Sequence, residues 1–146
     1  AMNDAQAAVR WVKAHAAEYG VDPTRVAIGG TSAGAITAIE VALNPDQPQG
    51  PTDSDQTNAV RAALSLSGAN IIGFPDPGDA PFLDWHGTAD PLVPYAWAVN
   101  TVSTARAVGI DAHLKTYEGE GHVPYNHRTE IHDQSRWHMD LAHAAV

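Results

Sequence analysis

The chain has 146 residues, 44% of them hydrophobic, which is enough for one domain with a substantial core over residues 1–146. Its 17 acidic residues outnumber its 8 lysines and arginines, and this excess argues against nucleic acid or an anionic membrane as a partner. With no cysteine and no long apolar run, the sequence excludes disulfides, thiolate metal sites and a cysteine nucleophile, and it indicates no membrane span.

The first half of the chain predicts two helices around a short strand. Residues 4–19 place apolar side chains at helical spacing, and Gly20 is a candidate C-cap. Residues 25–29 predict a buried strand, and residues 35–43 predict a helix because they contain no proline or glycine. The proline-rich polar stretch at 44–57 predicts a loop.

The second half continues the alternation of strands and helices. The predicted strands are residues 62–67, 82–86 and 112–117, and the predicted helices are residues 94–108 and 128–145. This alternation predicts an α/β fold with a mainly parallel sheet of about four strands and flanking helices. In such sheets the functional residues gather at the carboxyl ends of the strands.

Residues 30–34 read Gly-Thr-Ser-Ala-Gly and lie between the first predicted strand and the helix after it. A serine between glycines at a strand-to-helix turn is the pattern of a nucleophile elbow. We expect Gly30 and Gly34 to lack side chains because the turn is tight, which leaves the Ser32 hydroxyl exposed. The alternative is that Ser32 is simply a small residue at a tight turn.

Three residues of complementary chemistry follow three of the predicted strands. A serine hydroxyl needs a base within hydrogen-bond reach, and the base needs a carboxylate to orient it. Ser32 follows the first strand, Asp90 the third and His122 the fourth, so they predict a nucleophile, an acid and a base at one edge of the sheet. Asp90 precedes a proline and could instead form a turn. The alternative acids are Asp84, Glu118 and Glu120.

Other residues in the sequence are weaker candidates for a site. His86 ends a predicted strand, which favours packing or hydrogen bonding. Trp85 and Tyr95 are candidate walls of a substrate pocket. The remaining histidines near the C-terminus do not share one helical face, so we expect exposed polar positions and no metal site; they are His127, His132, His138 and His143.

Four stretches carry a resemblance to a known family: residues 22–26, 30–34, 86–94 and 119–122. Together they resemble the C-terminal portion of an α/β-hydrolase of the carboxylesterase/lipase kind, over nearly all of the chain. The resemblance implies a serine ester hydrolase with no cofactor, in which Ser32, Asp90 and His122 work through an acyl-enzyme. It also implies that the Ala33 amide is one oxyanion donor. The short link at 69–80 leaves no room for a lid, which favours small-molecule substrates that are short or exposed carboxylic esters.

The sequence also departs from this family. The family's first four strands have no counterpart here, nor does its early glycine-rich oxyanion loop. The strand at 25–29 then becomes an apolar sheet edge, so we expect either a homo-oligomer or docking onto a missing N-terminal half. The alternative function is a catalytically silent fragment, or half of a split hydrolase, that binds a partner chain through this edge. A peptidase or acyltransferase with the same triad also stays open.

Overall fold

A parallel sheet is the centre of the computed structural model, which describes residues 1–46 and 55–144. Within those residues the sheet has the order β1-β2-β3-β4, and each neighbouring pair is parallel. The strands are β1 (Ile28–Thr31), β2 (Ala63–Leu66), β3 (Phe82–Gly87) and β4 (Ala112–Tyr117). The predicted α/β class with about four parallel strands is confirmed. Most of the predicted loop at 44–57 lies outside the described residues.

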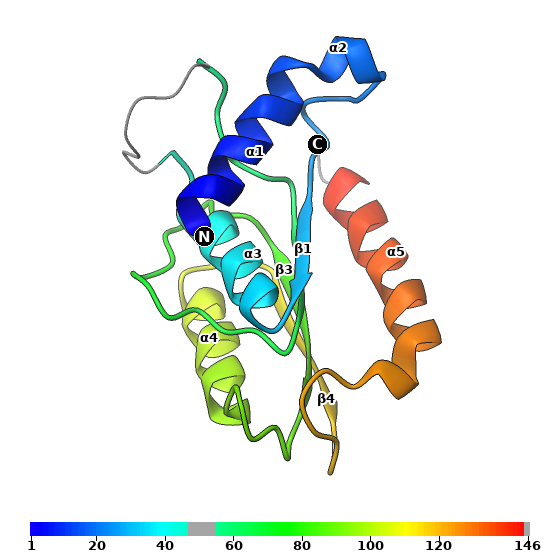
Figure 1. The fold of residues 1–146 in the computed structure, drawn as a ribbon. Helices are drawn as coiled ribbons and strands as arrows, with labels where there is room; N and C mark the ends of the chain where they lie inside the picture. The colour runs from blue at the N-terminus through cyan, green and yellow to red at the C-terminus, as the bar shows by residue number, and fades with distance from the viewer. Residues whose placement is uncertain (47–54, 145–146) are drawn as a thin grey trace.

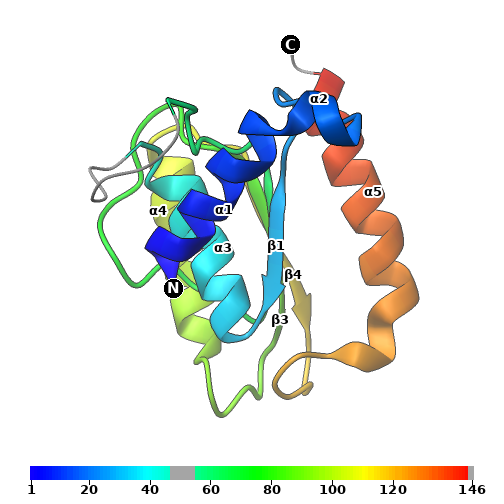
Figure 2. The ribbon, with the colours of Figure 1, turned by 45° about the horizontal axis from the view of Figure 1, so that its top comes forward.

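Helices cover both faces of this sheet, as Figures 1 and 2 show. The described helices are α1 (Met2–Ala14), α2 (Ala16–Tyr19), α3 (Ala33–Leu43), α4 (Tyr95–Ala107), the 3-10 turn η1 (Tyr125–His127) and α5 (Arg128–Ala144). In Figure 2, α1, α3 and α4 lie on one side of the sheet and α5 lies on the other. None of the helices in this part of the chain is both long and apolar enough to cross a membrane.

Two of the predicted element boundaries are wrong. The single helix expected at 4–19 is interrupted at His15, whose backbone (φ −103°, ψ 13°) separates α1 from α2. The first strand begins at Ile28 rather than at residue 25, and it continues through Thr31 because the sharp turn falls at Ser32 itself. Gly20 does end α2 in the left-handed conformation (φ 66°), as predicted.

The core has one hydrophobic cluster on each face of the sheet. Between the sheet and helices α3 and α4 lie Ile39, Ala42, Leu43, Ala63, Phe82, Val102, Ala105, Ile110 and Ala112. On the α5 side lie Leu66, Leu83, Trp85 and Tyr117, with Ile131 of α5 packed against them. Each large apolar side chain buried in this way contributes about 1.5–3 kcal/mol. The two clusters hold the strands in register, so their carboxyl ends form a defined edge.

The strand β1 lies at one side of the sheet and has β2 as its neighbour. Two of its four residues, Gly29 and Thr31, are exposed. An open, partly apolar strand edge is a site where another chain can pair. The structure therefore agrees with the expected open edge, while self-association and docking of a further segment stay predictions.

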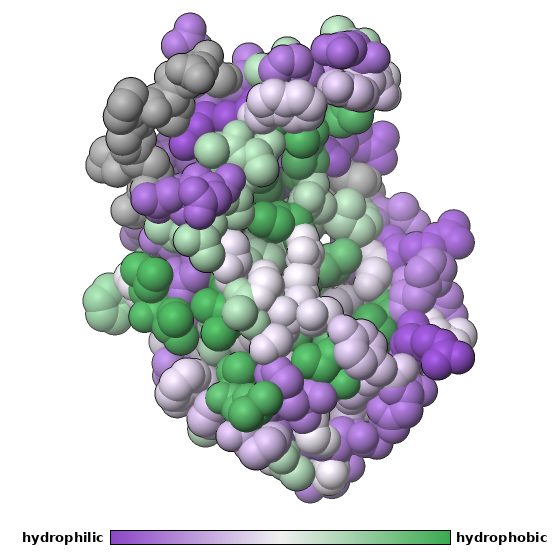
Figure 3. Space-filling view, viewed as in Figure 1, coloured by the Kyte–Doolittle hydropathy of each residue, from purple (hydrophilic) through white to green (hydrophobic). Residues whose placement is uncertain are grey.

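The buried carboxylate of Glu40, on α3, organises the loop that follows β2. Its Oε1 accepts hydrogen bonds from the backbone N–H groups of Ile71 (2.6 Å) and Ile72 (2.9 Å). The side chains of Ile71, Ile72 and Phe74 are exposed, and Figure 3 shows hydrophobic surface over this loop. Burial raises the pKa of Glu40, and the two amide hydrogen bonds only partly offset this shift.

We expect the stability of the chain to depend on pH through Glu40. With a raised pKa the folded chain holds a proton where the unfolded chain has released it, so the free energy of unfolding falls as pH rises. Glutamine can accept the same two hydrogen bonds but does not titrate. Wild type should therefore lose stability relative to Glu40→Gln between about pH 4 and about pH 7. Urea unfolding of both proteins at the two pH values measures their free energies of unfolding. If the difference between wild type and Glu40→Gln were the same at both pH values, the prediction would be contradicted.

Candidate active site

Ser32 lies at the turn between β1 and α3, at the carboxyl edge of the sheet. Its backbone has φ 55° and ψ −123°, a conformation that a residue other than glycine rarely adopts. The Ser32 N–H donates to the Leu66 carbonyl (2.9 Å), and its own carbonyl accepts from the Ile36 N–H (3.0 Å). Such strain costs about 1–3 kcal/mol and persists only where the surrounding structure enforces it. The turn thereby leaves the Ser32 side chain partly exposed at the edge.

The two glycines of this turn differ in how closely the chain approaches them. A Cβ added at Gly30 would overlap the backbone C and O atoms of Gly34, so position 30 requires glycine. A Cβ added at Gly34 would have no atom within 4 Å. The expectation that tight packing excludes a side chain therefore holds at Gly30 but not at Gly34.

The three residues predicted at the strand ends lie within hydrogen-bond distance of one another. The Ser32 Oγ is 2.7 Å from His122 Nε2, and His122 Nδ1 is 2.7 Å from Asp90 Oδ2. The Asp90 side chain is fully buried, and His122 is partly buried. This is the arrangement that a serine nucleophile, its base and an orienting acid require.

The environment of Asp90 keeps its carboxyl ionised. Its Oδ1 accepts hydrogen bonds from the backbone N–H groups of Leu92 (2.8 Å) and Val93 (3.0 Å). Burial raises the pKa of Asp90, but the hydrogen bonds from His122, Val93 and Leu92 outweigh burial and hold that pKa below its ordinary value. An ionised carboxylate accepts only, so His122 Nδ1 carries the hydrogen. In the neutral ring, Nε2 is then free to accept the Ser32 proton.

The loop that carries His122 is fixed by contacts that the sequence reasoning missed. The N–H of Val123 donates to the Ser67 hydroxyl (3.0 Å) at the end of β2. Both residues have positive φ angles, 61° for Ser67 and 54° for Val123. At the end of β3, a Cβ on Gly87 would overlap the carbonyl oxygens of Glu120 and Gly121. In the sequence the available signal was a serine directly after β2 and a glycine at the end of β3, but their partners lie far along the chain.

The alternative acids do not reach the base. Glu118 and Glu120 lie in the same loop as His122 but bond to other side chains, and Asp84 bonds to His86. Among the described residues, Asp90 is the carboxylate hydrogen-bonded to His122. The preference for Asp90 over its alternatives therefore agrees with the geometry.

The two residues suggested as pocket walls make their side-chain hydrogen bonds with residues outside the triad. Trp85 is 2% exposed, and its Nε1 donates to Gln134 Oε1 (2.7 Å) under α5. Tyr95 is half-buried, and its hydroxyl is 2.7 Å from the Thr116 hydroxyl on β4, the strand farthest from Ser32 in the sheet order. Their role in binding substrate stays a prediction.

One of the C-terminal histidines departs from the prediction of exposed polar positions. His138 is 2% exposed and packs edge-on against the ring of His113, with 6.2 Å between ring centroids. His127 is half-buried and stacks on Tyr117, while His132 is exposed. The side chain of His143 lies outside the described part. Within that part, no group of three or more histidine, aspartate or glutamate side chains is arranged to hold a metal ion.

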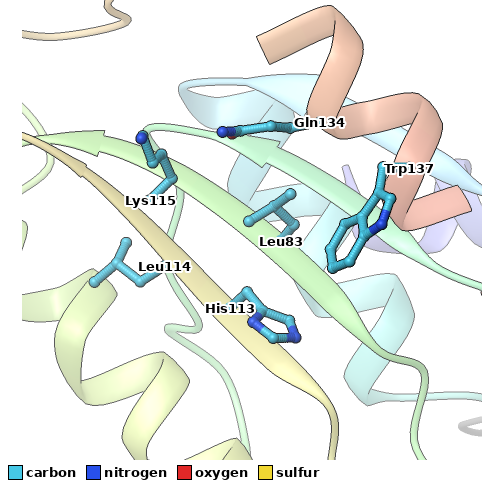
Figure 4. A pocket seen from close by; sticks show the side chains of 6 residues that line it. All are labelled: Leu83, His113, Leu114, Lys115, Gln134 and Trp137. Carbon is cyan, nitrogen blue, oxygen red and sulfur yellow. The ribbon is translucent and has the colours of Figure 1, made fainter. Parts of the chain in front are cut away.

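A separate pocket of about 480 Å³ lies between β3, β4 and α5. It is lined by Leu83, His113, Leu114, Lys115, Gln134 and Trp137. In Figure 4 the ring of Trp137 lies to the right of Leu83 and the ring of His113 lies below it. The Lys115 ammonium group that lines this pocket already has a partner, since it forms an ion pair with Glu130 (2.7 Å). None of the triad residues lines this pocket.

Comparison with known proteins places this chain in a family. The family model described as BD-FAE matches residues 1–73, and the model of the prolyl oligopeptidase family matches residues 43–142. The second model covers more than half of the chain, so the chain belongs to the prolyl oligopeptidase family, and the relatives and structures below support an α/β-hydrolase of the carboxylesterase kind. The resemblance seen in the sequence motifs is thereby confirmed.

The relatives are esterases from bacteria. A probable carboxylic ester hydrolase of Mycobacterium tuberculosis, LipM, is 41% identical over 66 residues, which are 44% of this chain and 15% of LipM. The carboxylesterase NlhH of the same organism is 34% identical over 84 residues, 57% of this chain and 25% of NlhH. The chain thus aligns with a quarter or less of the curated relatives it matches.

Solved structures share the fold over most of the chain. A thermophilic esterase from Thermogutta terrifontis superposes with a TM-score of 0.83 at 22% identity, covering 96% of this chain and 65% of the esterase. A truncated form of a carbohydrate esterase from gut microbiota superposes with a TM-score of 0.72 at 21% identity, covering 92% of this chain and 68% of that one. These likenesses confirm the α/β-hydrolase fold, of which the described chain presents a part.

Proposed function

We propose that the chain is a serine carboxylic-ester hydrolase that works through Ser32, His122 and Asp90. The observation that carries the proposal is the pair of 2.7 Å hydrogen bonds that join Ser32 to His122 and His122 to Asp90. A serine at a strained strand-to-helix turn, next to a base oriented by a buried carboxylate, is the arrangement that acyl transfer requires. The carboxylesterase relatives support the same reaction class.

The proposed reaction has two stages. Ser32 Oγ attacks the ester carbonyl while His122 Nε2 takes its proton, and the tetrahedral intermediate collapses as His122 returns that proton to the leaving alcohol. Water then attacks the acyl-enzyme and gives a proton to His122, and His122 returns that proton to Ser32 Oγ as the acid leaves. Asp90 stays ionised throughout and stabilises the His122 cation.

The Ala33 amide is the proposed oxyanion donor. Ala33 is the first residue of α3, and the N–H groups of a helix's first turn have no partner within the helix. This N–H immediately follows the nucleophile, so it is available to the oxygen that becomes charged in the tetrahedral intermediate. The roles of the three triad residues and of Ala33 need no cofactor or metal.

The proposed substrates are short or exposed carboxylic esters. Ser32 is partly exposed at the sheet edge, and the segment between β2 and β3, residues 67–81, is too short for a separate lid domain. Structures of the Thermogutta terrifontis esterase were solved with butyrate and with propionate bound, which are short acids. By analogy we expect short acyl groups to be preferred.

Two measurements on the purified chain test the proposal. We expect it to hydrolyse a short p-nitrophenyl ester, and we expect a fluorophosphonate probe to label it at Ser32, as located by peptide mass spectrometry. Labelling matters because it needs an assembled triad but not a complete substrate pocket. Absence of both signals would contradict the proposal and favour the catalytically silent module. Hydrolysis of amide as well as ester substrates would instead favour a peptidase.

A further inference from the structure

A second aspartate–histidine pair lies behind the triad. Asp84 and His86 are on β3 and point to the same face of the sheet, since alternate residues of a strand share a face. His86 Nδ1 is 2.9 Å from Asp84 Oδ2, and the two side chains are 0% and 2% exposed, respectively. Titratable groups are costly in a fully buried strand, where parallel sheets ordinarily carry apolar residues. Their presence here therefore calls for a role.

The other nitrogen of His86 joins this pair to the triad. His86 Nε2 is 2.9 Å from the Val93 carbonyl oxygen and 3.3 Å from Asp90 Oδ2. A carbonyl oxygen accepts only, so Nε2 carries a hydrogen, which it donates to Val93, and the Asp90 carboxylate lies beside the same N–H as a close electrostatic contact. Asp90 Oδ2 is the same oxygen that accepts from His122. The polar contacts thus run without a break from Asp84 through His86 and Asp90 to His122.

The far end of the pair is held by β2. Asp84 Oδ1 accepts a hydrogen bond from the Ser65 hydroxyl and another from the Gly68 N–H (3.2 Å). Burial lowers the pKa of His86, but the hydrogen bond and charge of Asp84, the hydrogen bond to Val93 and the charge of Asp90 together outweigh burial, and the net shift of this pKa is upward. The ring of Tyr95, on α4, also faces His86, edge-on with 6.0 Å between centroids. The ring of His86 is therefore fixed at both nitrogens.

We propose that Asp84 and His86 are positioning residues for the triad: the Nε2–H of His86 binds the Val93 carbonyl and lies against the Asp90 carboxylate, and Asp84 fixes the ring that supplies it. The inference rests on the proposed function of the triad. His86 anchors the turn after Asp90 through Val93, whose own N–H binds the other Asp90 oxygen. The carboxylate is thereby aimed at His122 before substrate arrives, as preorganised catalysis requires.

Two substitutions at one position separate positioning from packing. In His86→Gln the side-chain amide reaches the place of Nε2, so it keeps a donor toward Asp90 and Val93 but loses Asp84. In His86→Asn the amide reaches only the place of Nδ1, so it keeps the contact with Asp84 and loses Asp90 and Val93. We expect kcat to fall about tenfold or more in His86→Asn, with little change in KM, and about threefold or less in His86→Gln. Equal losses in both, or a loss in neither, would overturn the proposal.

A measurement without substrate makes the test independent of ester hydrolysis. The His122 Nδ1 proton, shared with Asp90, is expected to give a low-field proton NMR resonance in wild type and in His86→Gln. The resonance should weaken or shift in His86→Asn, and an unchanged resonance there would overturn the positioning role. If wild type shows the resonance but hydrolyses no ester, the proposed function has failed while the positioning role is still decided by the two variants.

A second pair of variants covers the case in which His86→Asn does not fold. Asparagine in Asp84→Asn can accept from Ser65 and Gly68 and donate to His86 Nδ1, which leaves the Nε2 hydrogen toward Asp90. Alanine in Asp84→Ala supports none of these contacts. We expect the low-field resonance to persist in Asp84→Asn and to weaken in Asp84→Ala. The same resonance in both would contradict the proposal.

Discussion

Hydrolysis of a short p-nitrophenyl ester is expected to fall by about 10³-fold or more in Ser32→Ala. Alanine has no oxygen with which to attack the ester carbonyl, so neither the acyl-enzyme nor the fluorophosphonate adduct can form. The fold should tolerate the change. The backbone hydrogen bonds that join Ser32 to Leu66 and Ile36 do not involve the side chain, and the hydroxyl's contact is with His122.

A matched serine provides the control. Ser103 is an exposed residue of α4, and Ser103→Ala should leave the rate and the labelling unchanged. Thermal unfolding of both variants should lie close to that of wild type, which would assign the lost rate to chemistry rather than to folding. If Ser32→Ala retained the wild-type rate, the hydrolysis would arise elsewhere and the proposed nucleophile would be wrong.

The second large effect is expected from Gly30→Ala. Its new Cβ would overlap the backbone carbonyl of Gly34, and a backbone cannot move aside as a flexible side chain can. We expect the free energy of unfolding to fall by about 3 kcal/mol or more. In the molecules that still fold, the turn must shift and carry Ser32 away from His122. A misplacement of about 1 Å lowers the rate by about 10²-fold, so probe labelling should fall as well.

The other glycine of the same turn is the control for stability. A Cβ in Gly34→Ala would meet no atom within 4 Å, and position 34 lies in the first turn of α3. Alanine favours helices over glycine by up to about 1 kcal/mol, so the free energy of unfolding should stay the same or rise slightly. Urea unfolding of the two variants measures the contrast. If Gly30→Ala proved as stable as Gly34→Ala, the close approach at position 30 would not limit the turn.

The amino-acid sequence by itself determined the class of fold and the three candidate residues. Strand and helix periodicity is local, and the order of alternating elements implies a parallel sheet whose carboxyl ends share one edge. Ser32, Asp90 and His122 could therefore be assigned to that edge from the strands they follow. The structure brings their side chains into contact, while their catalytic roles are proposed. The sequence did not predict the exact bounds of β1 or the break at His15. Pairing with β2 decides the bounds of the strand, and the backbone hydrogen bonds at His15 decide where α1 ends.

Only the tertiary structure decided the contacts between residues that lie far apart in the chain. No local pattern shows that the Ser67 hydroxyl accepts a hydrogen bond from the N–H of Val123, or that the His138 side chain of α5 is buried. The same holds for Asp84 and His86. Their spacing places them on one face of β3, but it does not show which groups lie opposite them. Sheet pairing and helix packing set those neighbours. Buried polar groups must find partners, so once the strands align, the donors and acceptors that meet are fixed by geometry in three dimensions.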